Sequence, residues 1–254
     1  MNLQSNHIYH IFNQGNNKQN IFFIRDNYLF FLEKLNQYIL PYSDILAWCL
    51  MPNHFHLMVY VHTFEIDAFN TNLISPINSL TPSETINNQD SPINSLTLSE
   101  AINNQDSRIN CFTPSEAINN QNPSDFINSK TRTFNDSIGL LLRTYTRAIN
   151  NQEKRTGSLF RPHSKAVCIS DPTSFSSLYF NTCFGTKLNV TFSDKEYPSV
   201  CFKYIHENPV SAKIVFKPED WEFSSCRDYA GLRNGKLINR QRAEYFGLSI
   251  NNFT

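Results

Sequence analysis

The sequence lacks the features that direct a chain into or across a membrane. It contains no apolar run of about 18 residues, so we expect no membrane-spanning helix. The first residues, Met1 to Gln4, are not a basic stretch followed by an apolar one, and we therefore expect no secretory signal. The six cysteines form no CxxC pair, which argues against a zinc ribbon or a redox dithiol and favours free thiols in a reducing cytoplasm.

The chain also has no net charge, because 22 lysines and arginines balance 22 aspartates and glutamates. A net charge of zero argues at first against a nucleic-acid partner. The acids are unevenly distributed, however, since residues 75–129 contain six of them and a single base, Arg108. The rest of the chain has 16 acids and 21 bases, a net charge of +5, which is compatible with DNA binding.

Residues 75–122 consist of three copies of a 16-residue repeat, which reads SPINSLTPSETINNQD in the first copy. Each copy has too few apolar residues to offset the entropy that is lost when a backbone is ordered. A solenoid would need a buried face in every copy. We therefore interpret residues 71–130 as a flexible, low-complexity surface insertion without a catalytic role, within a single domain that spans residues 1–254.

Outside the insertion, the spacing of apolar residues predicts strands and helices in alternation. The predicted strands are Ile8–Phe12, Ile21–Ile24, Ile45–Leu50, His54–Val61 and a strand near Ala166–Ile169. The predicted helices are one capped by Asp26 and stopped by Pro41, one capped by Asn135 or Asp136, and one from Pro198 to about Glu207. Short antiparallel connections between these elements predict an α+β fold, in which helices pack on one face of an antiparallel sheet.

Two histidines, His54 and His56, begin the strand that ends at Val61. Residues two apart in a strand project from the same face, so both imidazoles point together while Phe55 faces the core. Two imidazole nitrogens at one strand edge make half of a site for a divalent metal. Two surface histidines on a strand would explain the same pattern, because so short a motif often arises by chance.

Tyr204 and Asn208 are four residues apart, so they lie on one face of the predicted helix, and Pro209 places that face near the helix end. The amide oxygen of Asn208 can serve as a third metal ligand, and the phenol of Tyr204 can serve as a nucleophile. A phenol with a pKa of about 10 needs a metal-polarised phosphate or a nearby base to react at neutral pH. A core tyrosine followed by a helix-ending Asn-Pro would explain the same residues.

Four segments of the chain, taken in order, resemble the landmarks of one protein family. They are AWCLMPNHFHLMV (47–59), LLRTYTRAINNQEKRTGSLF (141–160), KYIHENPVSAKIV (203–215) and WEFSS (221–225). In this order they resemble the HUH signature, the middle helix with its basic connector, the catalytic helix and the C-terminal landmark of the single-tyrosine HUH transposases, the REP-associated and insertion-sequence type. The repeats, which interrupt the chain just after the histidine strand, and a long stretch from Ser174 to Tyr197 depart from the family pattern.

The resemblance implies a ferredoxin-like HUH fold in which His54, His56 and Asn208 bind Mg²⁺ or Mn²⁺ and Tyr204 is the catalytic nucleophile. Such an enzyme cleaves and rejoins single-stranded DNA near hairpins through a 5′-phosphotyrosine. The expected partner is single-stranded or hairpin DNA, with no membrane, and the expected location is a bacterial-type cytoplasm, at the nucleoid when DNA is bound. The sequence does not distinguish a monomer from a homodimer. Two other functions remain open: a metal-dependent single-strand nuclease that uses water, and a catalytically silent DNA-binding protein.

Several other residues compete for roles in such a site. Tyr145 is a rival nucleophile, but it lies on an apolar helical stripe, which favours core packing. His206 is two positions from Tyr204, which turns it roughly 200° around the helix and away from the site. We predict contacts to the DNA backbone for a set of basic residues: Arg143, Arg147, Lys154, Arg155, Arg161 and Lys165.

Overall fold

The structure is a computed structural model, and it describes residues 1, 3–67, 131–170, 179–182, 185–188 and 197–252. The predicted insertion at 71–130 and most of the stretch from Ser174 to Tyr197 lie outside the described residues. The strands are β1 (His7–Gln14), β2 (Ser43–Met51), β3 (His54–Val61), β4 (Glu65–Asp67), β5 (Thr131–Thr133), β6 (Lys165–Cys168), β7 (Tyr179–Thr182) and β8 (Gly185–Leu188). The α-helices are α1 (Arg25–Tyr38), α2 (Phe134–Gln152), α3 (Tyr197–Ser211), α4 (Cys226–Tyr229) and α5 (Arg240–Tyr245).

The centre of the fold is a four-stranded sheet with the order β2-β3-β1-β6, in which all neighbouring strands are antiparallel. The predicted antiparallel sheet within a mixed α/β fold is therefore confirmed. β4 pairs with β5, and β7 pairs with β8, in two further two-stranded ladders. None of the helices in the described residues is both long and apolar enough to cross a membrane.

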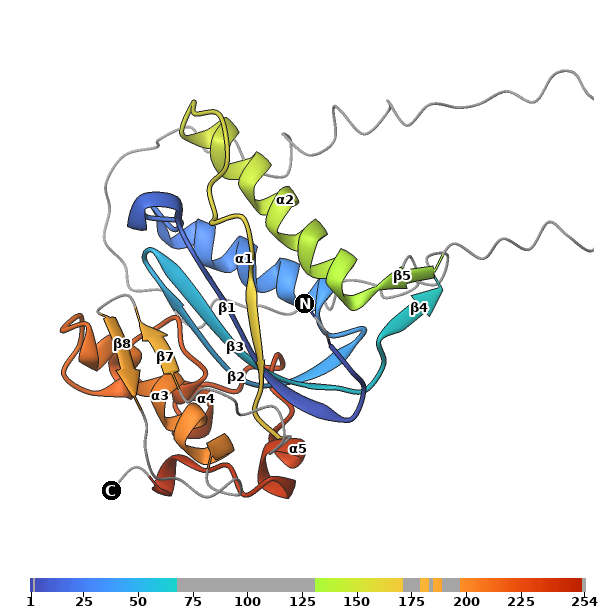
Figure 1. Cartoon of the computed structure of the whole chain (residues 1–254). Helices are drawn as coiled ribbons and strands as arrows, with labels where there is room; N and C mark the ends of the chain where they lie inside the picture. Colours follow the sequence, from blue (N-terminus) through green and yellow to red (C-terminus); the bar gives the residue numbers. More distant parts are fainter. Residues whose placement is uncertain (2, 68–130, 171–178, 183–184, 189–196, 253–254) are drawn as a thin grey trace, which may run out of the picture.

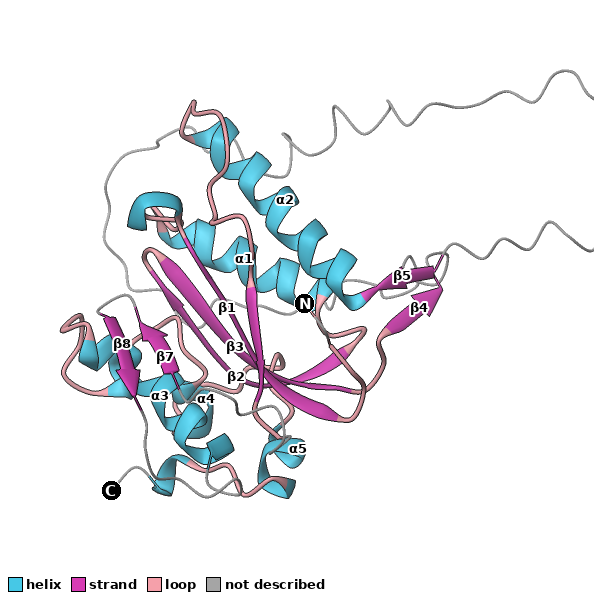
Figure 2. Ribbon diagram, viewed as in Figure 1, coloured by secondary structure: helices cyan, strands magenta, loops and turns pink. Residues whose placement is uncertain are grey.

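Helices cover both faces of the sheet (Figures 1 and 2). On one face, α1 and α2 pack over a core that contains Phe55 and Leu57 of β3. On the other face, α3 and α5 pack over a second core that contains Met58 of β3 and Cys49 of β2. The expectation of helices on a single face is therefore wrong, because side chains alternate along each strand and both sets are buried.

Four local predictions also differ from the structure. Asp26 does not cap the first helix, because α1 begins at Arg25 with Ile24 as its N-cap, and it is the side chain of Asn27 that accepts from the N–H of Ile24. Ile21–Ile24 is not a strand, because the N–H groups of Ile21 and Phe22 both donate to the carbonyl of Pro52 and so form no ladder. The N-cap of α2 is Thr133, whose hydroxyl accepts from the N–H of Asp136 in a capping box. The third helix does not end at Glu207: it continues past Pro209 to Ser211, and the N–H of Ala212 still donates to the Asn208 carbonyl.

The chain after α3 runs along the outer edge of β2. The N–H of Leu50 donates to the carbonyl of Phe223, and the N–H of Ser225 donates to that of Trp48, each at 2.9 Å. Further along, the N–H of Asn239 donates to the carbonyl of Ile45 at 2.9 Å. These bonds satisfy backbone groups that an edge strand would otherwise expose, and they fasten the C-terminal part of the chain to the sheet.

Candidate active site

The two histidines of β3 lie on the face of the sheet that α3 covers. Phe55 and Leu57 point into the core beneath α1 and α2, so the alternation of the strand sends His54 and His56 to the opposite side. Both imidazoles are buried, with only 6% and 4% of their surface exposed. The sequence prediction for β3, His54–Val61, matches the observed strand.

Asn208 of α3 contacts both of these histidines. Its Oδ1 lies 3.1 Å from Nε2 of His54, and its Nδ2 lies 3.4 Å from Nε2 of His56. The side chain of Asn208 is buried as well. Residues separated by about 150 positions in the chain thus direct two ring nitrogens and one amide at a common point.

Tyr204 lies one helical turn before Asn208, on the same face of α3. Its ring centroid is 5.3 Å from that of His56, and the two ring planes meet at 79°, an edge-to-face contact. The side chain is half-buried, unlike the fully buried histidines. The structure therefore brings together the four residues for which the sequence predicts a role in metal binding or catalysis.

Each histidine has a partner at its second ring nitrogen. Nδ1 of His54 lies 2.6 Å from Oδ1 of Asn53, and Nδ1 of His56 lies 2.9 Å from Nε2 of His10. Metal-binding histidines are commonly oriented in this way by a group at the nitrogen that does not bind the metal. Sequence reasoning missed His10, although a polar residue within the apolar pattern of Ile8–Phe12 was a signal that could have marked it.

Burial keeps the three imidazoles neutral at pH 7. It lowers the pKa of His10 to about 3, and it lowers the pKa of His54 to about 4 although the bond to Asn208 acts in the opposite direction. Burial also lowers the pKa of His56 well below its ordinary value, and the neighbouring His54 and His10 add to that effect. A neutral imidazole carries one N–H and one lone pair, which is the form that binds metals.

The proton count at His54 favours a cation at this point. A neutral ring has one N–H proton, yet the two ring nitrogens of His54 face two amide oxygens, those of Asn53 and Asn208. One oxygen therefore faces a lone pair. With the proton on Nδ1, that oxygen is the one of Asn208, and a positive ion between it and Nε2 of His54 would relieve the repulsion. Within the described residues, no group of three or more His, Cys, Asp or Glu side chains is placed to hold a metal. The ligand set that fits is two imidazole nitrogens and the amide oxygen of Asn208.

The competing residues lie elsewhere. Tyr145 is a buried residue of α2, on the opposite face of the sheet, where its hydroxyl donates to the carbonyl of Ile21 at 2.7 Å and burial raises its pKa. His206 is turned away from Tyr204, and its Nε2 lies 2.7 Å from Oγ of Ser225.

The predicted DNA-contacting residues do not gather on one face of the sheet. Arg143 and Arg147 are exposed on α2, which covers the face opposite the histidines. Lys165 is exposed on β6 and pairs with Phe12 of β1, whose ring lies 5.8 Å from His56, so Lys165 projects from the histidine face. The remaining three lie in the loop between α2 and β6, namely Lys154, Arg155 and Arg161.

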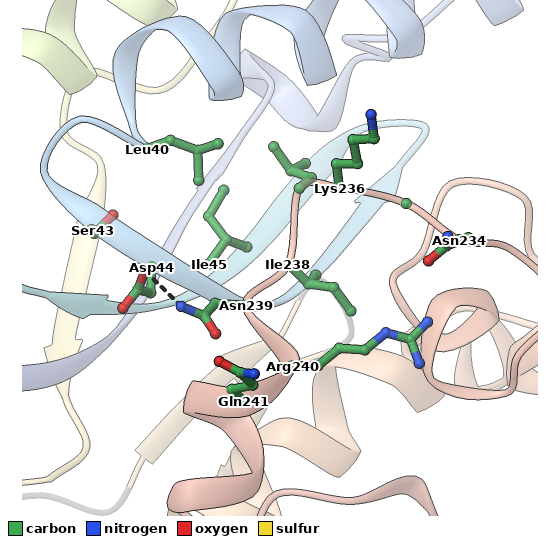
Figure 3. Close-up of a pocket in the computed structure, with 12 residues that line it drawn as sticks. Leu40, Ser43, Asp44, Ile45, Asn234, Lys236, Ile238, Asn239, Arg240 and Gln241 are labelled. Atoms are coloured by element: carbon green, nitrogen blue, oxygen red, sulfur yellow. Dashed lines mark hydrogen bonds between the residues drawn. The ribbon is translucent and has the colours of Figure 1, made fainter. Parts of the chain in front are cut away.

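An open groove with a volume of about 560 Å³ lies between the start of β2 and residues 234–241 (Figure 3). None of the predicted site residues lines it. Its main acid, Asp44, accepts hydrogen bonds from Asn239 at 3.0 Å and from Arg242 at 3.1 Å. These bonds hold the C-terminal chain against β2. The groove therefore marks the boundary where the C-terminal chain packs on the sheet, and it lies apart from the histidine cluster.

Comparison with known proteins gives a limited result. No family model matches the chain, and no curated protein matches it. A solved structure of a REP-associated tyrosine transposase bound to a REP hairpin is similar, with a TM-score of 0.43 and 13% identity, over 94% of this chain and 92% of that one.

Proposed function

We propose that this protein is a DNA transposase that cleaves and rejoins single-stranded, hairpin-bearing DNA with Tyr204 as its nucleophile. The observation that carries the proposal is the convergence of His54, His56, Asn208 and Tyr204 on one face of the sheet. The resemblance of four sequence segments to the single-tyrosine HUH transposases supports the same conclusion.

His54, His56 and Asn208 would hold Mg²⁺ or Mn²⁺, because both histidines are neutral and have an outer partner at Nδ1. When bound, such an ion supplies positive charge that polarises the scissile phosphodiester. Asn208 contributes an oxygen ligand, which suits these hard cations better than a third imidazole.

Tyr204 performs the covalent step. Its phenol oxygen bonds to phosphorus while the bond from phosphorus to the 3′ oxygen breaks, leaving a 5′-phosphotyrosine and a free 3′-hydroxyl. The proton lost by the phenol balances the one gained by the leaving 3′ oxygen. A second 3′-hydroxyl reverses the step, and the strands are joined without another energy source because the phosphotyrosine bond conserves the energy of the original phosphodiester.

The test uses purified protein, Mn²⁺ and an end-labelled single strand that carries the hairpins flanking the gene. We expect a labelled protein–DNA adduct that survives denaturing electrophoresis. Tyr204→Phe should abolish the adduct and retain binding of the hairpin. Tyr245→Phe is the matched control, because this tyrosine is 79% exposed, lies outside the site and should leave adduct formation unchanged.

Each other result contradicts a defined part of the proposal. An adduct that persists in Tyr204→Phe places the nucleophile elsewhere. Cleavage by the unaltered protein without any adduct indicates a hydrolytic nuclease that uses water. Tight hairpin binding that survives chelation, with no cleavage under Mg²⁺ or Mn²⁺, indicates a catalytically silent DNA-binding protein.

A further inference from the structure

His10 is a buried polar residue that contacts the candidate site from β1, as the outer partner of His56. It lies on β1 with 3% of its surface exposed. Its ring stacks on that of His56, with centroids 5.0 Å apart and planes at 28°, and its Nε2 lies 2.9 Å from Nδ1 of His56. The register of β1 and β3, in which Phe12 pairs with His56, places His10 one step along the same face.

The direction of this hydrogen bond follows from the other side of the His56 ring. Nδ2 of Asn208 lies 3.4 Å from Nε2 of His56, and an amide nitrogen can only donate. With the Asn208 amide in this orientation, Nε2 of His56 is the lone-pair nitrogen and the ring carries its proton on Nδ1. That N–H can only donate to Nε2 of His10, which must itself be unprotonated, with the His10 proton on Nδ1.

We propose that His10 is a positioning residue that holds His56 in the one tautomer able to bind a metal through Nε2. If the proton moved to Nε2, the same ring would present an N–H to the ligand point and could not coordinate there. This inference rests on the metal role proposed for His56. It adds a supporting residue, His10, which lies 46 positions earlier in the chain and on a different strand.

Simple packing is the other explanation for His10. Its ring also stacks on Phe12 at 4.8 Å and meets the edge of Tyr204 at 6.1 Å, contacts that an apolar side chain could supply. Packing predicts that substitutions matter according to their volume. Positioning predicts that they matter according to whether an acceptor remains opposite Nδ1 of His56.

The experiment compares His10→Gln, whose side-chain oxygen keeps an acceptor, with His10→Leu, which removes it. His7→Leu is the control, because His7 lies on the same strand but its Nδ1 contacts the carbonyl of Ser5, outside the site. Ring ¹⁵N shifts of the metal-free proteins report the tautomer of His56, and calorimetric titration with Mn²⁺ alone reports metal affinity. Thermal melts verify that each variant folds.

We expect the unaltered protein and His10→Gln to hold the His56 proton on Nδ1, and their Mn²⁺ affinities to agree within about threefold. His10→Leu should lose the preference for that tautomer and lose about 10–100-fold in affinity, as is usual when an outer partner is removed. His7→Leu should match the unaltered protein in both measurements.

Failure of this inference differs from failure of the proposed function. If the unaltered protein carries the His56 proton on Nε2, or if folded His10→Leu keeps both tautomer and affinity, the role of His10 is refuted while metal binding stands. If the unaltered protein has the expected tautomer but binds no Mn²⁺, the metal role is refuted. If His10→Leu does not fold, the ¹⁵N shifts of the unaltered protein and the affinity of His10→Gln decide: loss of affinity in His10→Gln despite a retained acceptor refutes the inference.

Discussion

Replacing Tyr145 by phenylalanine separates stability from chemistry in this fold. The ring of Tyr145 has no exposed surface, and it meets Phe31 edge-to-face at a centroid distance of 5.0 Å. The substitution keeps that ring and removes only the hydroxyl, which donates to the carbonyl of Ile21 at 2.7 Å. The change therefore deletes one buried hydrogen bond and leaves the aromatic packing in place.

The expected cost follows from that single bond. A net hydrogen bond contributes about 1 kcal/mol, and an acceptor left unsatisfied in the interior can cost about 1–3 kcal/mol. We expect Tyr145→Phe to lower the free energy of unfolding by about 1–2 kcal/mol. For a chain of this size that corresponds to a fall in Tm of roughly 3–6 °C.

Tyr204→Phe should instead abolish the adduct with little change in the free energy of unfolding, because Tyr204 is half-buried and its ring contacts His56 on the other face of the sheet. Urea unfolding and the denaturing-gel adduct assay, applied to both variants, give the comparison. Loss of the adduct in a folded Tyr145→Phe protein would refute the assignment of the nucleophile. An unchanged urea midpoint in Tyr145→Phe would refute the energetic role of the bond to Ile21.

The remaining predictions concern packing, pH and thiol reactivity. Gly235→Ala should destabilise the fold by about 1–3 kcal/mol in urea unfolding, because the new Cβ would lie 2.6 Å from Oδ1 of the buried Asp228. Gly139→Ala, inside α2, should instead stabilise it by up to about 1 kcal/mol, since only a flexible arginine tip is in the way. Burial lowers the pKa of His206 from 6.5 to about 3, so between those values the unfolded chain binds a proton that the folded chain does not. Stability should then fall as the pH drops from 7 to 5, with a slope of up to about 1.4 kcal/mol per pH unit from this residue, and the slope should be smaller in His206→Gln. Among the described cysteines, Cys168 is partly exposed and the other three are buried, so mass spectrometry after brief iodoacetamide treatment should find Cys168 alkylated before Cys49, Cys201 and Cys226.

Local periodicity explains what could be predicted from the sequence. The alternation of apolar and polar residues, bounded by the turn at Met51-Pro52-Asn53, gave β3 with its observed ends and set His54 and His56 on one face. The four-residue spacing of Tyr204 and Asn208 set both on one face of α3. These inferences need only the geometry of a single strand or helix, which neighbouring residues determine.

Long-range pairing explains what could not be predicted. His10 resembles any polar residue in a buried strand until the register of β1 and β3 is known, and that register depends on contacts about 45 residues apart. The covering of the second sheet face by α3 depends in the same way on how a distant helix docks. Arg143 and Arg147 have the spacing of exposed helix residues, but only the packing of α2 shows that they lie opposite the histidines.

The short ladder of β4 and β5 bears on how the number of tandem repeats in this gene can change. Glu65 pairs with Thr133 and Asp67 pairs with Thr131, so the chain leaves the described fold and re-enters it between two hydrogen-bonded strands. This stem lies at the α2 side of the molecule, away from α3 (Figure 1). Because its bonds are made by residues outside the tandem copies, slippage during replication could add or delete a copy without separating the two ends. Alleles that differ in copy number should therefore fold alike.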